Sequence, residues 1–242
     1  MIRMEDELVY EGKRILCVIP ARAGSRQLVG KNMRLLAGKP LIQYAFENAQ
    51  GCPEIDRTIV STDSDDVASL ARELGLHVPF RRPAALAEGH VGTIDVLLHA
   101  MDYIEQRERD HYDVLVLLHA TAPLCAVEDV TACIQTLISS GAGSVFTVAP
   151  AQRNPYFNMV EISEDGTVRL CKQGDFATRQ DAPKVYELNS AVYAWRWDSL
   201  RDHKSVVLPD SRVHVMPRER SIDIDDELDL QLAELIIARD AQ

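Results

Sequence analysis

Residues 14–32 read Arg-Ile-Leu-Cys-Val-Ile-Pro-Ala-Arg-Ala-Gly-Ser-Arg-Gln-Leu-Val-Gly-Lys-Asn, a short apolar run followed by a basic, glycine-containing loop. The apolar run is typical of a strand that is buried on both faces of a parallel sheet. Ligands of such sheets sit beyond the carboxyl ends of the strands, which is where this loop begins. Gly24 and Gly30 allow close approach of the backbone to an anion, and Arg22, Arg26 and Lys31 supply three cations. The segment therefore predicts a triphosphate-binding loop.

Two other interpretations of this loop have to be weighed. A Walker A loop has four residues between its glycines and a Ser or Thr after its lysine. Here five residues separate Gly24 from Gly30, and Asn32 stands in place of the hydroxyl, so that motif is excluded. On composition alone, an ordinary solvated basic loop stays as an alternative.

Apolar runs and helical patterns alternate along the first 150 residues. The pattern predicts strands at 58–62, 77–80, 114–118 and 144–148, and helices near 41–49, 65–74, 93–105 and 128–137. Such alternation indicates an α/β fold, a three-layer, mostly parallel, Rossmann-like sheet with right-handed crossovers. We expect one domain over residues 1–242, which begins with a polar extension at 1–13.

The pattern changes after Pro150. Two extended runs flank Asp165-Gly166, a good hairpin turn, so that residues 150–188 predict a β-rich arm. Strands return at 190–195 and 213–216, and an amphipathic helix closes the chain at 226–239.

An acidic cluster lies just before that last helix. In Ser221-Ile-Asp-Ile-Asp225 the two carboxylates of Asp223 and Asp225 share one face of an extended segment, about 7 Å apart at roughly 3.3 Å per residue. This arrangement suits Mg²⁺ (or Mn²⁺), which takes one or two carboxylates beside substrate phosphates. The alternative is that Asp225 or Asp226 caps the helix and that Asp223 is solvated; for Asp226 we favour capping.

Composition limits the classes of function. The formal net charge of −11 argues against a nucleic acid partner, and no apolar run approaches the roughly 20 residues of a membrane helix. The five cysteines form no C-x-x-C pair, which favours free thiols in a reducing compartment. With no apolar signal-peptide core near the start, we expect a cytoplasmic protein.

Two further positions are candidates for binding a sugar acid. Arg179-Gln180 could bind a carboxylate and hydroxyls, although a surface salt bridge is a common alternative. His119 ends an apolar strand on the expected ligand side and is a weaker candidate.

The order of these motifs resembles the acylneuraminate cytidylyltransferase family, also called CMP-sialic acid synthetases. The resemblance extends from Arg14 to Arg239. It is carried by residues 19–25, 31–32, 38–41, 61–63 and 82–86, by Asp95, Thr121 and 123–124, and by 179–181, Asn189 and 221–225.

The resemblance implies a glycosyltransferase-A-like (nucleotide-diphospho-sugar transferase) fold and a homodimer in which the arm of one subunit reaches the sugar site of the other. It implies transfer of CMP from CTP to the anomeric 2-hydroxyl of a nonulosonic acid such as N-acetylneuraminic acid, with release of pyrophosphate. The implied roles are CTP binding by Arg22, Arg26, Lys31, Asn32, Arg82 and Thr93, metal binding by Asp223 and Asp225, and sugar binding by His119, Arg179, Gln180 and Asn189. Arg22 and Lys31 would also be catalytic, together with the two aspartates, one of which would help to deprotonate the attacking hydroxyl.

Departures from the family pattern bear mainly on the sugar. The usual Gln-Pro-Thr-Ser-Pro-Leu is His119-Ala-Thr-Ala-Pro-Leu124, the basic residue before Leu-Asn-Gly is Glu187, and an Asp-Thr pair is Gly89-His90. Legionaminic, pseudaminic or eight-carbon ulosonic acids are therefore alternative substrates. A third hypothesis is a nucleotide-binding protein that has lost catalysis. The presence of all four expected catalytic residues argues against it: Arg22, Lys31, Asp223 and Asp225.

Overall fold

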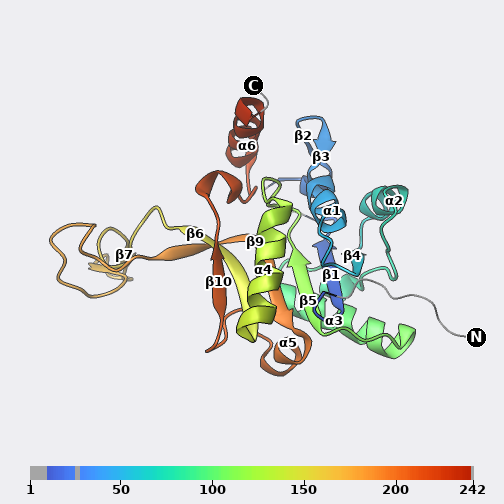
Figure 1. Cartoon of the computed structure of the whole chain (residues 1–242). Helices are drawn as coiled ribbons and strands as arrows, with labels where there is room; N and C mark the ends of the chain where they lie inside the picture. Colours follow the sequence, from blue (N-terminus) through green and yellow to red (C-terminus); the bar gives the residue numbers. More distant parts are fainter. Residues whose placement is uncertain (1–9, 25–27, 241–242) are drawn as a thin grey trace, which may run out of the picture.

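A computed structural model describes residues 10–24 and 28–240, and its centre is a six-stranded sheet in the order β10-β6-β9-β5-β1-β4 (Figure 1). The strands are β1 (Ile15–Ala21), β4 (Arg57–Thr62), β5 (Val114–Leu118), β6 (Ser144–Pro150), β9 (Tyr186–Arg196) and β10 (Arg212–Val215). β1 runs parallel to β4 and β5, and β10 runs parallel to β6, whereas β9 is antiparallel to both of its neighbours. The expected α/β fold with a mostly parallel sheet is confirmed.

Helices cover both faces of this sheet. They are α1 (Leu41–Gly51), α2 (Asp65–Glu73), α3 (Thr93–Tyr103), α4 (Val127–Ser140), α5 (Trp197–His203) and α6 (Glu227–Asp240). The alternation of side chains along β1 explains the layers. Ile15 and Ile19 belong to the core that includes α1, α2 and α4, while Leu16 and Val18 belong to the core that includes α3 and α5.

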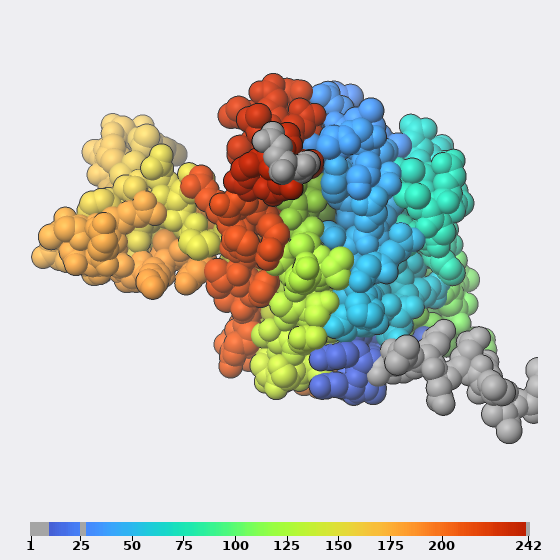
Figure 2. All heavy atoms as spheres, turned by 45° about the horizontal axis from the view of Figure 1, so that its top comes forward, coloured from blue at the N-terminus to red at the C-terminus, as the bar shows by residue number. Residues whose placement is uncertain are grey.

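A third, smaller core fixes the end of the chain. Leu230 and Ala233 of α6 pack with Leu36, Leu41 and Ile224. In Figure 2 this helix therefore lies against the blue segment that follows β1. The packing brings the acidic segment before α6 back to the loop at the start of the chain.

The arm leaves the sheet at the end of β6 and returns at the start of β9. It contains a hairpin of β7 (Val160–Ile162) and β8 (Val168–Leu170), and all six of these strand residues are exposed. Gly166 takes a φ of +84° in the expected turn. Figures 1 and 2 show the arm projecting away from the body of the molecule.

Short elements complete the chain. They are η1 (Lys31–Met33), β2 (Leu35–Leu36), β3 (Lys39–Pro40), η2 (Ala84–Leu86), η3 (Ile104–Glu108) and η4 (Arg218–Arg220). The strand expected at 77–80 is wrong: this stretch runs beside β4 but meets it only in isolated bridges, from His77 to Ile59 and from Arg81 to Thr62. Pro79 lies between them and has no backbone N–H to donate to a ladder. No helix within the described ranges is long and apolar enough to cross a membrane.

Candidate active site

The loop after β1 is held in shape by side chains from two neighbouring segments. The Ala23 amide donates a hydrogen bond to Asp63 Oδ1 (2.8 Å), and Asn32 Nδ2 donates to the Arg22 carbonyl (2.9 Å). Asn32 therefore shapes the loop, and its own amide nitrogen is already engaged. Arg26, predicted to bind CTP, lies outside the described residues.

Arg82 is the most buried cation of the site, with only 4% of its surface exposed. Its Nε donates to Ser61 Oγ (3.1 Å) and its Nη2 donates to the Ser61 carbonyl. In the described part of the chain, no carboxylate lies within ion-pair distance of this guanidinium. Burial lowers the pKa of Arg82 to about 10, with Asp63 acting to raise it and Arg22 to lower it. The side chain remains a cation at neutral pH and can bind an acceptor-rich ligand.

Arg22, Arg82, Thr93 and His119 line one cavity of about 220 Å³. Pro20 and Glu88 also contribute to its wall. Four residues that are widely separated in the sequence thus meet at the carboxyl edge of the sheet. A heterocycle with several hydrogen-bond acceptors suits this cavity, since most of its polar lining consists of donors.

Lys31 connects the loop to the acidic segment. Its Nζ donates to the Ile224 carbonyl (2.7 Å) and to Asp225 Oδ1 (3.2 Å). The lysine predicted to bind phosphate is therefore paired with an aspartate predicted to bind metal. Asp225 itself is exposed, so this ion pair is open to exchange with a ligand.

Asp223 lies deeper than Asp225. Burial raises the pKa of its carboxyl, and the nearby Asp225 adds to that rise, while the Thr121 and Ser190 hydroxyls and Lys31 oppose it. Its Oδ1 is buried and has no hydrogen-bond partner among residues 10–24 and 28–240. A buried, unpaired carboxylate oxygen is costly unless a ligand or cation completes it.

The donor set of this segment fits a magnesium ion bound together with a substrate. No group of three His, Cys, Asp or Glu side chains able to hold a metal occurs in the described ranges. Two carboxylates from the protein are what Mg²⁺ usually takes when substrate phosphates supply further oxygens. Asp223 and Asp225 match that requirement. The capping alternative holds only for Asp226, whose Oδ1 accepts from the Leu228 and Asp229 amides.

The structure places the predicted sugar residues in three different settings. His119 borders the cavity just described, and burial together with Lys31 lowers its pKa to about 4, so the imidazole is neutral. Asn189 is 4% exposed and engaged on both sides: Oδ1 accepts from Thr147 Oγ1 (2.6 Å) and Nδ2 donates to Ser221 Oγ (2.9 Å). It connects β6 to the acidic segment.

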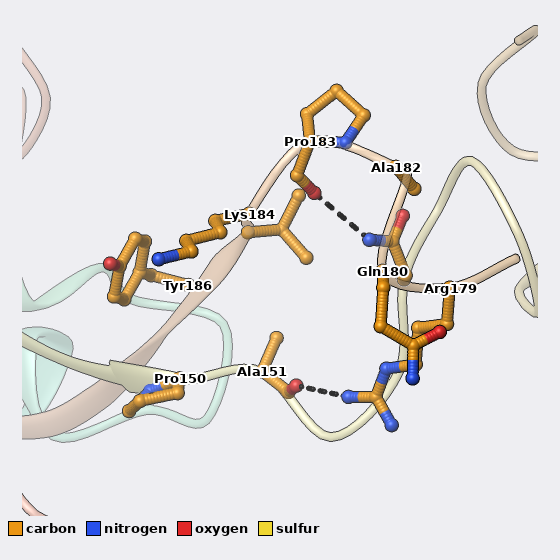
Figure 3. Close-up of a pocket in the computed structure, with 10 residues that line it drawn as sticks. Pro150, Ala151, Arg179, Gln180, Ala182, Pro183, Lys184 and Tyr186 are labelled. Atoms are coloured by element: carbon orange, nitrogen blue, oxygen red, sulfur yellow. Dashed lines mark hydrogen bonds between the residues drawn. The ribbon is translucent and has the colours of Figure 1, made fainter. Parts of the chain in front are cut away.

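Arg179 and Gln180 lie in the arm, in a separate cavity of about 630 Å³ (Figure 3). The Arg179 guanidinium donates to the Ala151 carbonyl (3.1 Å), while Lys184 and Tyr186 line the facing wall. Arg153, Arg179 and Arg218 share a neighbouring hollow whose lining includes no carboxylate. The arm thus presents basic groups. They line cavities that are separate from the one lined by His119.

Sequence reasoning assigned no role to several residues that shape the site. Ser61 holds Arg82, Asp63 holds the loop, and Ser190 faces Asp223 with a φ of +52°. Left-handed backbone is uncommon for a residue with a Cβ and concentrates at functional sites. The sequence did mark this position: Ser190 stands where the Leu-Asn-Gly pattern of the family has Gly, the residue that takes left-handed backbone most readily.

Three comparisons bear on this geometry. Residues 16–200 match the family model described as Cytidylyltransferase. The chain is 35% identical to CMP-N,N'-diacetyllegionaminic acid synthase of Campylobacter jejuni, covering 93% of this chain and 95% of that protein. It is 30% identical to pseudaminic acid cytidylyltransferase of the same species, covering 91% and 95%.

The fold is also similar to that of solved proteins. CMP:2-keto-3-deoxy-manno-octonic acid synthetase complexed with CTP superposes with a TM-score of 0.70 at 18% identity, covering 94% of this chain and 99% of the other. At that identity the likeness concerns the fold alone. The family model and the relatives carry the assignment, and they confirm the resemblance drawn from the sequence motifs. The chain belongs to the cytidylyltransferase family.

Proposed function

We propose that the protein joins CMP, taken from CTP, to the anomeric 2-hydroxyl of a nonulosonic acid and releases pyrophosphate. The observation that carries the proposal is the ion pair between Lys31 and Asp225, because it joins the loop after β1 to the acidic segment. The relatives named for CMP-legionaminic and pseudaminic acid synthesis support the reaction class.

The basic residues of the loop would offset the negative charge of the CTP phosphates. The attacking hydroxyl must reach an α-phosphate that is surrounded by negative oxygens, and Arg22 and Lys31 reduce that repulsion. Lys31 would exchange Asp225 for a phosphate when CTP binds, because the pair is partly open to solvent. Arg82 and Thr93 would bind the cytosine in the adjacent cavity. Holding both reactants in line accounts for much of the remaining barrier.

We propose Mg²⁺ (or Mn²⁺) as the metal, held by Asp223 and Asp225. When bound, such an ion would stabilise the developing negative charge on the phosphate oxygens. The unpaired Oδ1 of Asp223 and the exposed Asp225 carboxylate support this assignment.

The sugar is proposed only as a class. N-acetylneuraminic acid, legionaminic acid, pseudaminic acid and an eight-carbon ulosonic acid all carry the carboxylate and hydroxyls that Arg179 and Gln180 could bind. His119 offers a neutral imidazole in place of an amide, which changes the hydrogen bonds available to the sugar. The 35% identity to a legionaminic acid enzyme makes that sugar the first to test.

We also propose a homodimer in which each arm completes the sugar site of its partner. Val160, Ile162 and Val168 expose 53%, 72% and 62% of their surfaces, respectively. An isolated two-stranded hairpin is marginal in water, so a second copy that covers these side chains would stabilise the arm. The separation of Arg179 from the cavity of His119 supports a site shared between subunits.

The cytoplasm is the proposed location. All five cysteines are free thiols, and burial raises the pKa of Cys52 to about 11, which keeps that thiol protonated and unreactive. Unpaired cysteines are typical of a reducing compartment.

Pyrophosphate release tests the proposal. The protein would be incubated with CTP, Mg²⁺ and, one at a time, the four sugar acids named above. We expect release with CTP and at least one nine-carbon acid, and none without sugar. CTP binding without turnover of any sugar would instead favour a binding protein that has lost catalysis.

A further inference from the structure

A buried carboxylate outside the predicted site is connected to the acidic segment. Asp129, in the first turn of α4, is fully buried. Its Oδ2 accepts a hydrogen bond from the Ala126 amide (3.0 Å). Its Oδ1 accepts from Arg220 Nη2 (2.9 Å) and lies 3.1 Å from His214 Nε2.

Arg220 is the last residue of η4 and lies three positions before Asp223. The chain from Ser221 to Asp225 belongs to no strand or helix, so no ladder of backbone hydrogen bonds fixes it. Separate contacts hold it instead: Ser221 binds Asn189, and the Ile224 amide donates to the Thr121 carbonyl (2.7 Å). The ion pair with Asp129 holds Arg220, the residue immediately before this segment.

The chemistry of the pair favours a positioning role. The Asp129 carboxylate is fully buried, whereas the Arg220 side chain is 40% exposed. Such a pair contributes little net stability, because desolvation of the carboxylate offsets the attraction, but it fixes geometry, and losing Arg220 would leave a buried charge without this cation. The Arg220 Nε, buried without a partner among the described residues, adds a further desolvation cost. Metal-binding carboxylates must be held within about 0.5 Å of a productive arrangement, which gives such a costly contact a function.

We propose that Asp129 is a positioning residue for the metal-binding carboxylates, acting through Arg220 on the segment that carries Asp223 and Asp225. The inference rests on the proposed function, since it assumes that these carboxylates hold a metal with CTP. It adds Asp129 and Arg220 to the residues on which metal affinity depends, through their effect on the position of the acidic segment and not as metal ligands.

Binding of Mn²⁺ tests this role without relying on turnover. Arg220→Met removes the charge and keeps most of the apolar stem, and the side chain is 40% exposed, so the variant should fold. Arg212→Met is the matched control, because the Arg212 guanidinium donates to the neighbouring Asp210 and Ser211 carbonyls and makes no ion pair among residues 10–24 and 28–240. Mn²⁺ would be titrated by electron paramagnetic resonance into each full-length protein saturated with CTP.

We expect Arg220→Met to weaken Mn²⁺ binding about 10-fold, the usual scale for groups that orient metal ligands. Arg220→Lys should restore part of that loss, Asp129→Asn should reproduce it, and Arg212→Met should leave the affinity unchanged. CTP binding measured in EDTA should be the same in all four variants, which separates metal positioning from general damage.

Wild-type Mn²⁺ affinity in Arg220→Met would overturn the inference, including the case in which the melting temperature falls but metal binding does not. Pyrophosphate release tests the proposed function separately from the positioning role. If wild-type protein released no pyrophosphate with any sugar, while Mn²⁺ binding with CTP still weakened in Arg220→Met, the reaction would be wrong and the positioning role would stand.

Discussion

The carboxyl edge of the sheet and the arm differ in whether their side chains find partners within the chain. At the edge, Arg82 is held by Ser61, Lys31 by Asp225, and the loop by Asp63, all within one chain. In the arm, the hairpin exposes apolar side chains on a projection from the body (Figure 2). The edge is organised before any ligand arrives, whereas the exposed hairpin of the arm has the character expected of the proposed contact with a second subunit. The nucleotide half and the sugar half of the proposed site should therefore respond differently to mutation.

The largest effect is expected at Asp223, in the organised half. Asp223→Asn should lower pyrophosphate release by at least about 10³-fold, because charge stabilisation at the phosphates is lost. The raised pKa of Asp223 means that the fold disfavours its charged form. Wild-type stability in EDTA should therefore fall as pH rises through that raised pKa, and the variant should melt no lower than wild type at pH 7.

Asp226→Ala is the control for Asp223→Asn. Asp226 caps α6, so the variant should lose about 1 kcal/mol of unfolding free energy and keep its turnover. Full turnover in Asp223→Asn would show that the Asp223 carboxylate is not needed for the reaction and would refute the proposed metal site.

Arg82→Met should have the next largest effect, about 10²-fold in kcat/KM for CTP. The substitution removes a buried cation that is held by Ser61 and leaves the arm untouched. Steady-state kinetics with CTP as the varied substrate measures the loss. An unchanged KM and kcat for CTP would show that the cavity of Arg22 and Arg82 does not bind the nucleotide.

A smaller effect is expected from charging the arm. Ile162→Asp with Val168→Asp should give a monomer by light scattering and reduce turnover about 10-fold, because the proposed sugar contacts come from the partner. The exposed Leu235 of α6 provides the control: Leu235→Asp changes an equally exposed leucine and should leave the dimer intact. A fully active monomer would refute the shared site.

His119→Gln should change the rate with CTP least, by about threefold or less, while altering the preference among sugars. Its effect on acid stability has a definite sign. The pKa of His119 falls from 6.5 unfolded to about 4 folded, so the unfolded state binds the extra proton and wild-type stability declines as pH falls from 6.5 toward 4. Melting temperatures at pH 7 and pH 5 should differ less in the variant than in wild type.

Local patterns in the sequence predicted much of the organised half. The apolar run of β1 and its basic loop, and the alternation of strands and helices, depend on burial and turn chemistry that neighbouring residues encode. The hairpin at Asp165-Gly166 was found for the same reason. The strand expected at 77–80 failed because two isolated bridges, at His77 and Arg81, join this stretch to β4 and no ladder forms between them.

Contacts between distant residues could not be predicted in the same way. Lys31 and Asp225 are 194 positions apart, and Asp129 and Arg220 are 91 apart. No local pattern encodes such a pairing. Asn189 shows the limit of transferring a role by motif: the position was found, but its donor and acceptor are engaged with Ser221 and Thr147. Arg179 and Gln180 stay predictions, since their contacts would lie on a partner.

A mixed dimer tests the comparison most directly. One protomer would carry Asp223→Asn and the other Arg179→Ala, each with a different affinity tag so that the heterodimer can be purified. If the arm of one protomer completes the site of its partner, one of the two sites has both an intact acidic segment and an intact Arg179. The mixed dimer should then show about half of wild-type pyrophosphate release, well above either parent dimer. Activity no higher than the mean of the two parents would contradict the shared site.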